Sequence, residues 1–186
     1  MIMIALIIVA AVVVLLIIFV IGIYNALIRL RNQVDNSWSQ IDVQLKRRHD
    51  LIPNLVETAK GYMKHERGTF EAITNARSQA MGAKSVSEAS KAEGALGEAL
   101  SKFMLVVENY PDLKANQNFL SVQEELTSTE NKISFARQSY NDQVLFFNNK
   151  IQMFPSNIVA NVFNFGKRDF FELEVAAERE VPKVSF

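Results

Sequence analysis

The 186-residue sequence has no cysteine and only two histidines. Without cysteine the chain has no disulfide bonds, no thiolate ligands for zinc, no cysteine-ligated iron–sulfur cluster and no cysteine nucleophile. Neither His49 nor His65 lies in an HExxH motif or in another spacing typical of metal ligands. The sequence therefore predicts no metal site and no cofactor.

Motifs for other kinds of catalysis are also missing. The glycines are scattered and form no phosphate-binding loop, and no GxSxG nucleophile motif occurs. The carboxylates of Glu124, Glu125 and Glu130 cluster on a segment rich in polar residues, where such side chains usually face water. We expect a protein without enzymatic activity.

Charge is absent from the beginning of the chain. The 20 basic and 20 acidic residues balance, which argues against a dedicated nucleic-acid surface. All of them lie at or beyond Arg29, so the chain divides into an apolar segment and a water-soluble remainder.

Residues 1–23 form an unbroken apolar run, long enough to span a bilayer core of about 30 Å. A cleaved signal peptide is the alternative, but the run lacks a charged beginning, is too long and has no small-x-small cleavage site. We therefore expect a retained transmembrane anchor. Tyr24, Arg29 and Arg31 follow it where aromatic and basic residues meet lipid headgroups.

The membrane orientation follows from the basic residues. Arg29, Arg31, Lys46, Arg47 and Arg48 all follow the apolar run, so the positive-inside rule favours a short outside N-terminus and a cytoplasmic body. The opposite orientation is left open.

The remainder has helical periodicity almost throughout. Apolar residues spaced by three and four predict a buried seam that contains Val34, Trp38, Ile41, Leu45, Ile52 and Leu55. Pro53 falls inside this seam, where it predicts a kink or a short break. Ser85-Val86-Ser87-Glu88 matches a capping box and opens another helix, and a third helix is expected from near Asp112 to Met153.

These patterns predict an all-α fold: an N-terminal transmembrane helix followed by an elongated antiparallel bundle of three to four long helices. The expected divisions are an anchor over residues 1–24, a bundle over 25–153, and a phenylalanine-rich segment and tail over 154–186.

Polar residues close to the seam form one candidate site. A seam arginine must find a carboxylate or extend to water, because an unpaired buried charge is costly. We expect a buried or half-buried network that fixes the register of the bundle and draws on Arg48, Asp50, Glu130, Arg137, Tyr140 and Asn141.

The end of the chain is rich in phenylalanine. Phe163, Phe165, Phe170 and Phe171 either fold back to close one end of the bundle or form an interaction patch for self-assembly or for the membrane surface. The first interpretation is favoured.

Several ordered segments together resemble the LemA family, and they extend over essentially the whole chain. They are Tyr24-Asn25, Leu30-Arg31-Asn32-Gln33-Val34, Asp50-Leu51-Ile52-Pro53-Asn54-Leu55-Val56, Lys60-Gly61-Tyr62, Tyr110-Pro111, Gln123-Glu124-Glu125-Leu126, Thr129-Glu130-Asn131, Ala136-Arg137 with Tyr140-Asn141, and Phe154-Pro155-Ser156-Asn157. The stretch from Gly82 to about Ser101 follows no tight pattern.

The resemblance implies a bacterial single-pass protein of the inner membrane, with a helical-bundle domain and no catalytic site. It also implies genomic association with membrane metalloproteases, which makes such a protease a candidate partner, and a link of some relatives to membrane organisation.

Two functions are therefore expected. The favoured one is a membrane-anchored scaffold or adaptor that binds the lipid bilayer and self-associates into homo-oligomers. The alternative is a membrane-shaping protein that assembles laterally into large oligomers. A single uncharged span has no polar residue to line a transport pathway, so a transporter role is not favoured.

Overall fold

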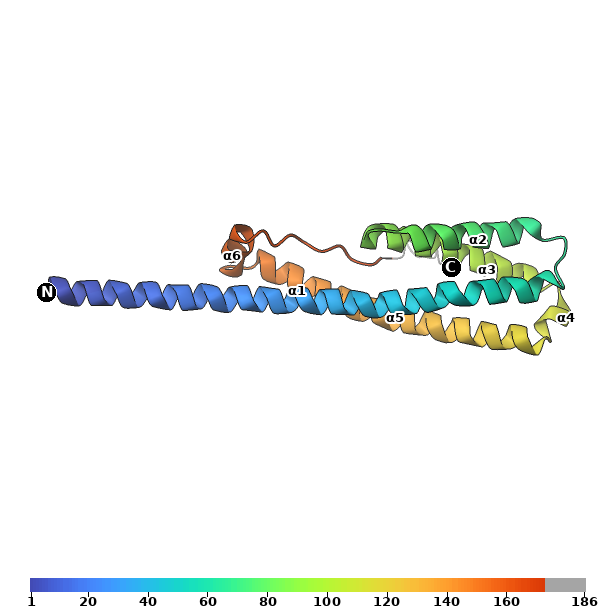
Figure 1. Cartoon of the computed structure of the whole chain (residues 1–186), viewed down its shortest axis with the longest axis horizontal. Helices are drawn as coiled ribbons and strands as arrows, with labels where there is room; N and C mark the ends of the chain where they lie inside the picture. Colours follow the sequence, from blue (N-terminus) through green and yellow to red (C-terminus); the bar gives the residue numbers. More distant parts are fainter. Residues whose placement is uncertain (173–186) are drawn as a thin grey trace, which may run out of the picture. The chain divides into compact units, whose positions relative to one another are not determined.

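A computed structural model describes residues 1–172, and every regular element in that range is a helix (Figure 1). The helices are α1 (Ile2–Lys60), α2 (Arg67–Gly82), α3 (Val86–Val107), α4 (Pro111–Lys114), α5 (Gln117–Gln152) and α6 (Ser156–Val162). The all-α fold class is confirmed, with a long apolar N-terminal helix followed by helices that pack antiparallel.

These helices contribute to two compact units. The first contains Met1–Ser39 and Ser139–Arg168; the second contains Gln40–Gln138 and, within the described residues, 169–172. The divisions expected at residues 24 and 153 rest on changes in the composition of the sequence. The compact units have other limits, because each of α1 and α5 contributes to both units.

The second unit has the larger hydrophobic core. The end of α1, all of α2, α3 and α4, and the beginning of α5 contribute to it. Its core includes Ile52, Leu55, Ala59, Met63, Ile73, Leu96, Phe103, Leu113 and Phe119. The Phe103 ring lies at the centre, with centroids 6.2 Å from Phe70 and 6.4 Å from Phe119. Three helices therefore meet at one aromatic cluster.

The first unit pairs the beginning of α1 with the end of α5 and with α6. Leu27 and Val34 of α1 are buried, as are Val144, Phe147 and Ile151 of α5. Trp38 is half-buried, and its ring centroid lies 5.5 Å from that of Tyr140. Of the other residues expected in the seam, Ile41, Leu45, Ile52 and Leu55 are buried in the second unit.

Of the kink or short break expected at Pro53, the break is wrong: α1 continues through this residue to Lys60. The chain instead turns at residues 61–66, before α2. This turn is held at its end by Tyr110, whose hydroxyl donates to Glu66 Oε1 at 3.0 Å. That hydrogen bond, together with desolvation, raises the pKa of Tyr110.

The start of α3 agrees with the capping pattern of the sequence. Ser85 Oγ accepts a hydrogen bond from the Glu88 backbone N–H at 3.2 Å. The Glu88 carboxylate accepts in turn from the backbone N–H of Lys84, one residue before the cap. The cap thus marks the beginning of α3, and Glu93 lies about two turns further on.

Candidate functional site

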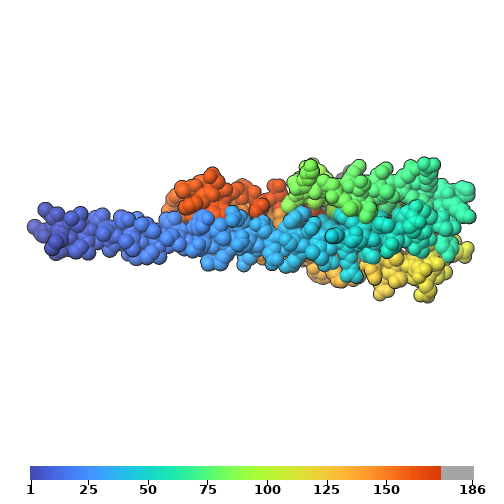
Figure 2. All heavy atoms as spheres, viewed as in Figure 1, coloured from blue at the N-terminus to red at the C-terminus, as the bar shows by residue number. Residues whose placement is uncertain are grey.

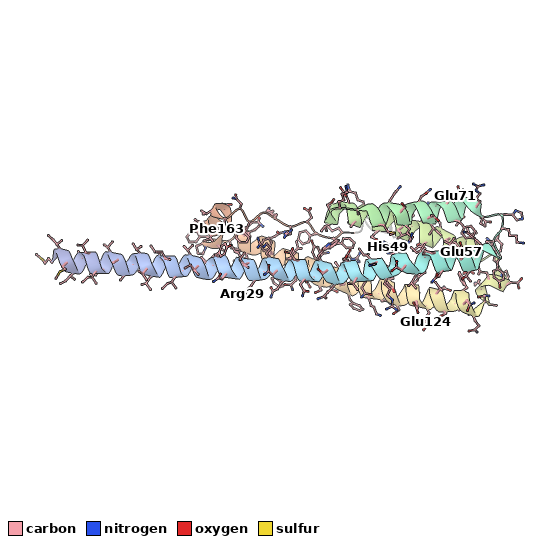
Figure 3. All side chains as sticks on the ribbon, in the orientation of Figure 1. Arg29, His49, Glu57, Glu71, Glu124 and Phe163 are labelled. Atoms are coloured by element: carbon pink, nitrogen blue, oxygen red, sulfur yellow. The ribbon has the colours of Figure 1, made fainter. Side chains whose placement is uncertain are left out.

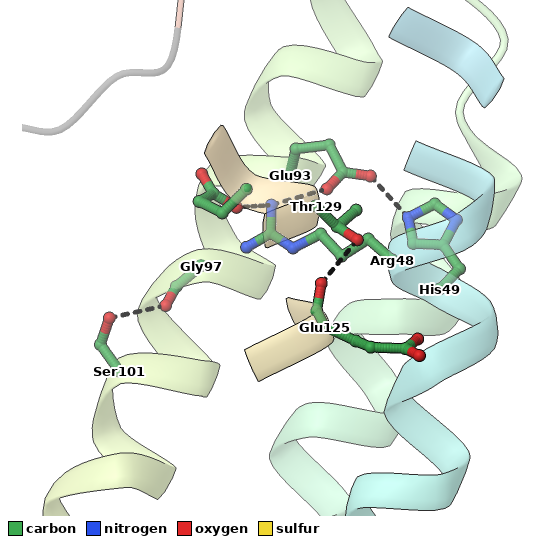
Figure 4. Close-up of polar contacts among 8 residues, drawn as sticks. Arg48, His49, Glu93, Gly97, Ser101, Glu125 and Thr129 are labelled. Atoms are coloured by element: carbon green, nitrogen blue, oxygen red, sulfur yellow. Dashed lines mark hydrogen bonds and ion pairs between the residues drawn. The ribbon is translucent and has the colours of Figure 1, made fainter. Parts of the chain in front are cut away.

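A buried arginine and glutamate link α1 to α3 in the second unit. Arg48 and Glu93 are only 6% and 2% exposed. Arg48 Nη1 lies 3.4 Å from Glu93 Oε2 and 3.1 Å from Glu130 Oε2 of α5 (Figure 4). The Glu130 side chain is half-exposed, so one carboxylate of this group reaches water while the other is enclosed. A single guanidinium thus joins three helices.

His49 provides the second contact to the same carboxylate. Its Nε2 lies 2.6 Å from Glu93 Oε1, and the ring is buried. Arg48 and His49 are consecutive residues, so their side chains leave α1 about 100° apart and reach Glu93 from two directions (Figure 4). Each oxygen of the buried carboxylate therefore has its own partner.

Pro53 adds a backbone contact to this group. Proline has no N–H, so the carbonyl of His49, four residues earlier, has no donor from that position of the helix. Arg77 of α2 supplies the missing donor: its Nε donates to the His49 carbonyl oxygen at 2.7 Å. The guanidinium of Arg77 explains how α1 continues through Pro53: the carbonyl that the proline leaves unpaired is hydrogen-bonded from a neighbouring helix.

We name Arg48, His49, Arg77, Glu93 and Glu130 the interhelical polar network. Its members come from α1, α2, α3 and α5, and the contacts above link each of them to another member. Nearby, the buried Thr129 hydroxyl donates to the Glu125 carbonyl in its own helix.

The network differs in membership from the one expected. Arg48 and Glu130 are brought together, whereas Asp50 is exposed on α1 and Arg137 is half-buried further along α5. Tyr140 and Asn141 belong to the first unit.

The sequence reasoning missed Glu93, His49 and Arg77. A signal for Glu93 was present, because it lies three residues before the buried Leu96 and four after the buried Ala89. That spacing puts a carboxylate on the apolar face of α3. Nothing in the sequence pattern pointed to Arg77.

The residues expected at the membrane interface lie in the first unit. Tyr24 is half-buried, with ring centroids 4.7 Å from Phe163 and 5.8 Å from Phe165. Arg31 lies over the Phe165 ring, 5.6 Å from its centroid, and Arg29 is exposed. Figure 3 shows Arg29 and Phe163 at a similar level along α1.

The four phenylalanines of the last segment are divided between the two compact units. Phe163 and Phe165 pack beside Tyr24 in the first unit, and Phe163 keeps half of its surface exposed. Phe170 and Phe171 belong to the second unit, where Phe171 is fully buried and Phe170 is partly exposed. Phe165 and Phe171 thus pack against other parts of the chain, whereas closure of one end of the bundle and an interaction patch both stay predictions. The expected tail beyond residue 172 lies outside the described residues.

In the described residues, no group of three or more histidine, aspartate or glutamate side chains is arranged to hold a metal ion.

Removal of Glu93 tests the network. Glu93→Leu leaves Arg48 and His49 without their shared buried carboxylate, so we expect the free energy of unfolding to fall by about 3 kcal/mol or more. The matched control is Glu125→Leu, which removes a half-exposed carboxylate 3.8 Å from Arg47 and is expected to cost no more than about 1 kcal/mol. Chemical denaturation followed by circular dichroism in mild detergent measures both. Equal losses in the two variants would contradict the network's role.

The contact between Arg77 and the His49 carbonyl calls for a double-mutant cycle. Arg77→Leu leaves a carbonyl unpaired and is expected to cost about 1–3 kcal/mol. In a Pro53→Ala background the residue at position 53 supplies its own N–H, so the same substitution should cost about 1 kcal/mol less. Arg67→Leu, at the exposed start of α2, serves as the control and should show no coupling to Pro53→Ala. Equal costs for Arg77→Leu in both backgrounds would mean that Arg77 does not compensate for the proline.

Comparison with known proteins places the chain in a family. A model of the LemA family matches residues 37–186. The chain is 28% identical to Protein LemA of Metamycoplasma hominis, over 88% of this chain and 73% of that protein. It is 22% identical to Magnetosome protein MamQ 2 of Paramagnetospirillum magneticum and 21% identical to Magnetosome protein MamQ of Magnetospirillum gryphiswaldense, in each case over 85% of this chain and 68% of the relative. The resemblance seen in the sequence is confirmed, and the chain belongs to the LemA family.

Proposed function

We propose that this protein is a non-catalytic, membrane-anchored helical scaffold or adaptor that self-associates. The observation that carries the proposal is the beginning of α1. Its most apolar 18-residue window is long and apolar enough to cross a membrane, and none of that window is buried. Figure 2 shows these residues as a single column that no other segment covers on the visible face.

The exposure of this segment separates two explanations of an apolar helix. A core helix of a water-soluble protein buries its large side chains, each contributing about 1.5–3 kcal/mol. Here large side chains such as Leu6, Leu15 and Phe19 remain more than half exposed. Hydrocarbon is the environment that suits such a surface, which supports a transmembrane anchor.

The rest of α1 supports a scaffold role. The same helix contributes buried side chains to both compact units, and its polar side chains Arg48 and His49 pair with Glu93 instead of facing a cleft. The proposed task is therefore to hold a helical surface at the membrane.

Exposed apolar side chains supply surfaces for self-association. On the second unit Phe135 of α5 is 75% exposed and Leu105 of α3 is 71% exposed. Side chains of this size at the surface are typical of contacts with other proteins when they gather in patches. Proposed partners are the lipid bilayer, further copies of this chain and, through the family resemblance, a membrane metalloprotease.

Lateral assembly into large membrane-shaping oligomers is the second candidate function. The relatives named as magnetosome proteins favour it. Particle size distinguishes the two candidates.

The test compares the full chain with a variant that lacks residues 1–23, which keeps Tyr24 and its ring contacts. The full chain should stay in the membrane fraction after alkaline carbonate extraction, whereas the shortened chain should become soluble, since it has lost the apolar segment. In mild detergent a scaffold should form small complexes, while membrane shaping requires large ordered oligomers that depend on residues 1–23. Release of the full chain by carbonate, or strict monomers throughout, would contradict the proposal.

We also propose that the helical units lie on the cytoplasmic side, because the basic residues after the anchor follow the positive-inside rule. The chain has no cysteine, so a single Ser87→Cys substitution on the exposed surface of α3 provides a unique label site. In intact cells this cysteine should resist a membrane-impermeant maleimide and react only after lysis. Rapid labelling in intact cells would show that the helical units lie on the outside.

A further inference from the structure

The first unit exposes an apolar surface next to the end of the anchor. Five large apolar side chains between the end of α5 and the residue after α6 are at least half exposed: Met153, Phe154, Ile158, Val162 and Phe163. We name these five residues the α6 foot. Ile158 and Val162 are four residues apart and therefore share one face of α6, opposite the buried Val159 and Ala160.

Ring contacts fix the level of this surface along α1. The Phe163 ring lies 4.7 Å from that of Tyr24, the residue that directly follows the apolar run. The run of 23 residues is about 35 Å long as a helix, and a bilayer core is about 30 Å thick. When the run spans the core, Tyr24 lies among the headgroups, and Phe163 lies there with it.

The segment after α6 is held in place by further contacts. The Phe165 backbone N–H donates to the Ala160 carbonyl, and the Phe165 ring packs against Tyr24 and Phe147. Asn148 and Arg168 exchange two hydrogen bonds of 2.9 Å, and Arg168 pairs with Asp35. These contacts fix the segment that follows the foot to α1 and α5, while the foot side chains stay exposed.

The charge of the first unit favours an anionic surface. Its residues include five basic side chains, Arg29, Arg31, Lys150, Lys167 and Arg168, and two acidic ones, Asp35 and Asp142. Positive charges thus exceed negative charges by three. Basic residues beside a membrane span are attracted to anionic lipid headgroups.

We propose that the α6 foot is a second membrane contact, which inserts into the headgroup region of the leaflet from which α1 emerges. The inference rests on the proposed anchor, because α1 sets the level of the foot. Its occupant is the surface of an anionic lipid bilayer, and the apolar side chains reach about 5–10 Å into the boundary between headgroups and acyl chains. The protein would therefore hold the membrane at two points, one spanning and one interfacial.

Spin labels at single cysteines test the foot in the full chain. Three variants are compared: Ile158→Cys in the foot, Leu15→Cys in the apolar run, and Asn36→Cys as an exposed control of the same unit further along α1. Val162→Cys repeats the measurement at a second foot position. The labelled proteins are reconstituted in vesicles of phosphatidylcholine and phosphatidylglycerol, and circular dichroism verifies that each remains helical.

The readout is the accessibility of each label to oxygen, which concentrates in lipid, relative to a water-soluble nickel chelate. We expect the ratio at positions 158 and 162 to be several-fold higher than at position 36, and to fall when phosphatidylglycerol is left out. A lipid-exposed label at position 15 with water-exposed labels at 158 and 162 would overturn the foot alone. A water-exposed label at position 15 would overturn the anchor and the foot together.

A second copy of the chain is the competing occupant. If copies cover the foot, labels at position 158 should show spin–spin broadening that disappears on dilution with unlabelled protein. Their accessibility to oxygen and to the nickel chelate should both be low. That result would also overturn the proposal.

Discussion

The carboxylate of Glu93 is the constraint on which the second unit depends. It is enclosed among helices, where a single unpaired charge is strongly destabilising, so its two partners must be present when the bundle closes. Arg48 and His49 meet this need from adjacent positions of α1, and the same arginine reaches Glu130 of α5. An apolar seam tolerates sliding by one turn, because leucine and isoleucine pack in many ways. A charged group with fixed partners does not, and for this reason we expect the network to specify alignment more strongly than the core around it.

Pro53 is a case in which a rule based on the local sequence fails, because a residue from another helix compensates for it. Taken alone, it predicts an interruption of the helix, since proline removes one hydrogen bond and crowds the preceding turn. The observed helix continues because a residue 24 positions later in sequence, Arg77, donates to the carbonyl concerned. No pattern within one helix contains this information. The turn forms instead at residues 61–66, which Gly61 opens and Tyr110 holds through Glu66.

The same distinction explains what could be read from the sequence in advance. The apolar run, the three-and-four spacing of Val34, Ile41 and Leu45, and the cap at Ser85 are local signals, and they predicted the fold class and the start of α3 correctly. They did not predict the interruption at residues 115–116, which divides the helix expected from near Asp112 to Met153 into α4 and α5. The partners in the polar network depend on which helix faces lie opposite one another. Arg48 was recognisable from the sequence as a buried charge that needs a carboxylate, and the expected Glu130 does lie beside it. Glu93 could have been recognised only from its position on the apolar face of α3. Tyr140 was also expected in the network, and its ring centroid lies 5.5 Å from that of Trp38 in the first unit.

Trp38 has a practical consequence of its own. It is the only tryptophan in the chain, and its neighbour Tyr140 lies within the same compact unit. Intrinsic fluorescence therefore reports the environment of one unit, whereas far-ultraviolet dichroism averages over every helix. Comparison of the two signals during a titration measures cooperativity between the units without any added dye. Coincident midpoints would indicate that both units unfold as one thermodynamic system, and separate midpoints would reveal an intermediate in which one unit stays folded.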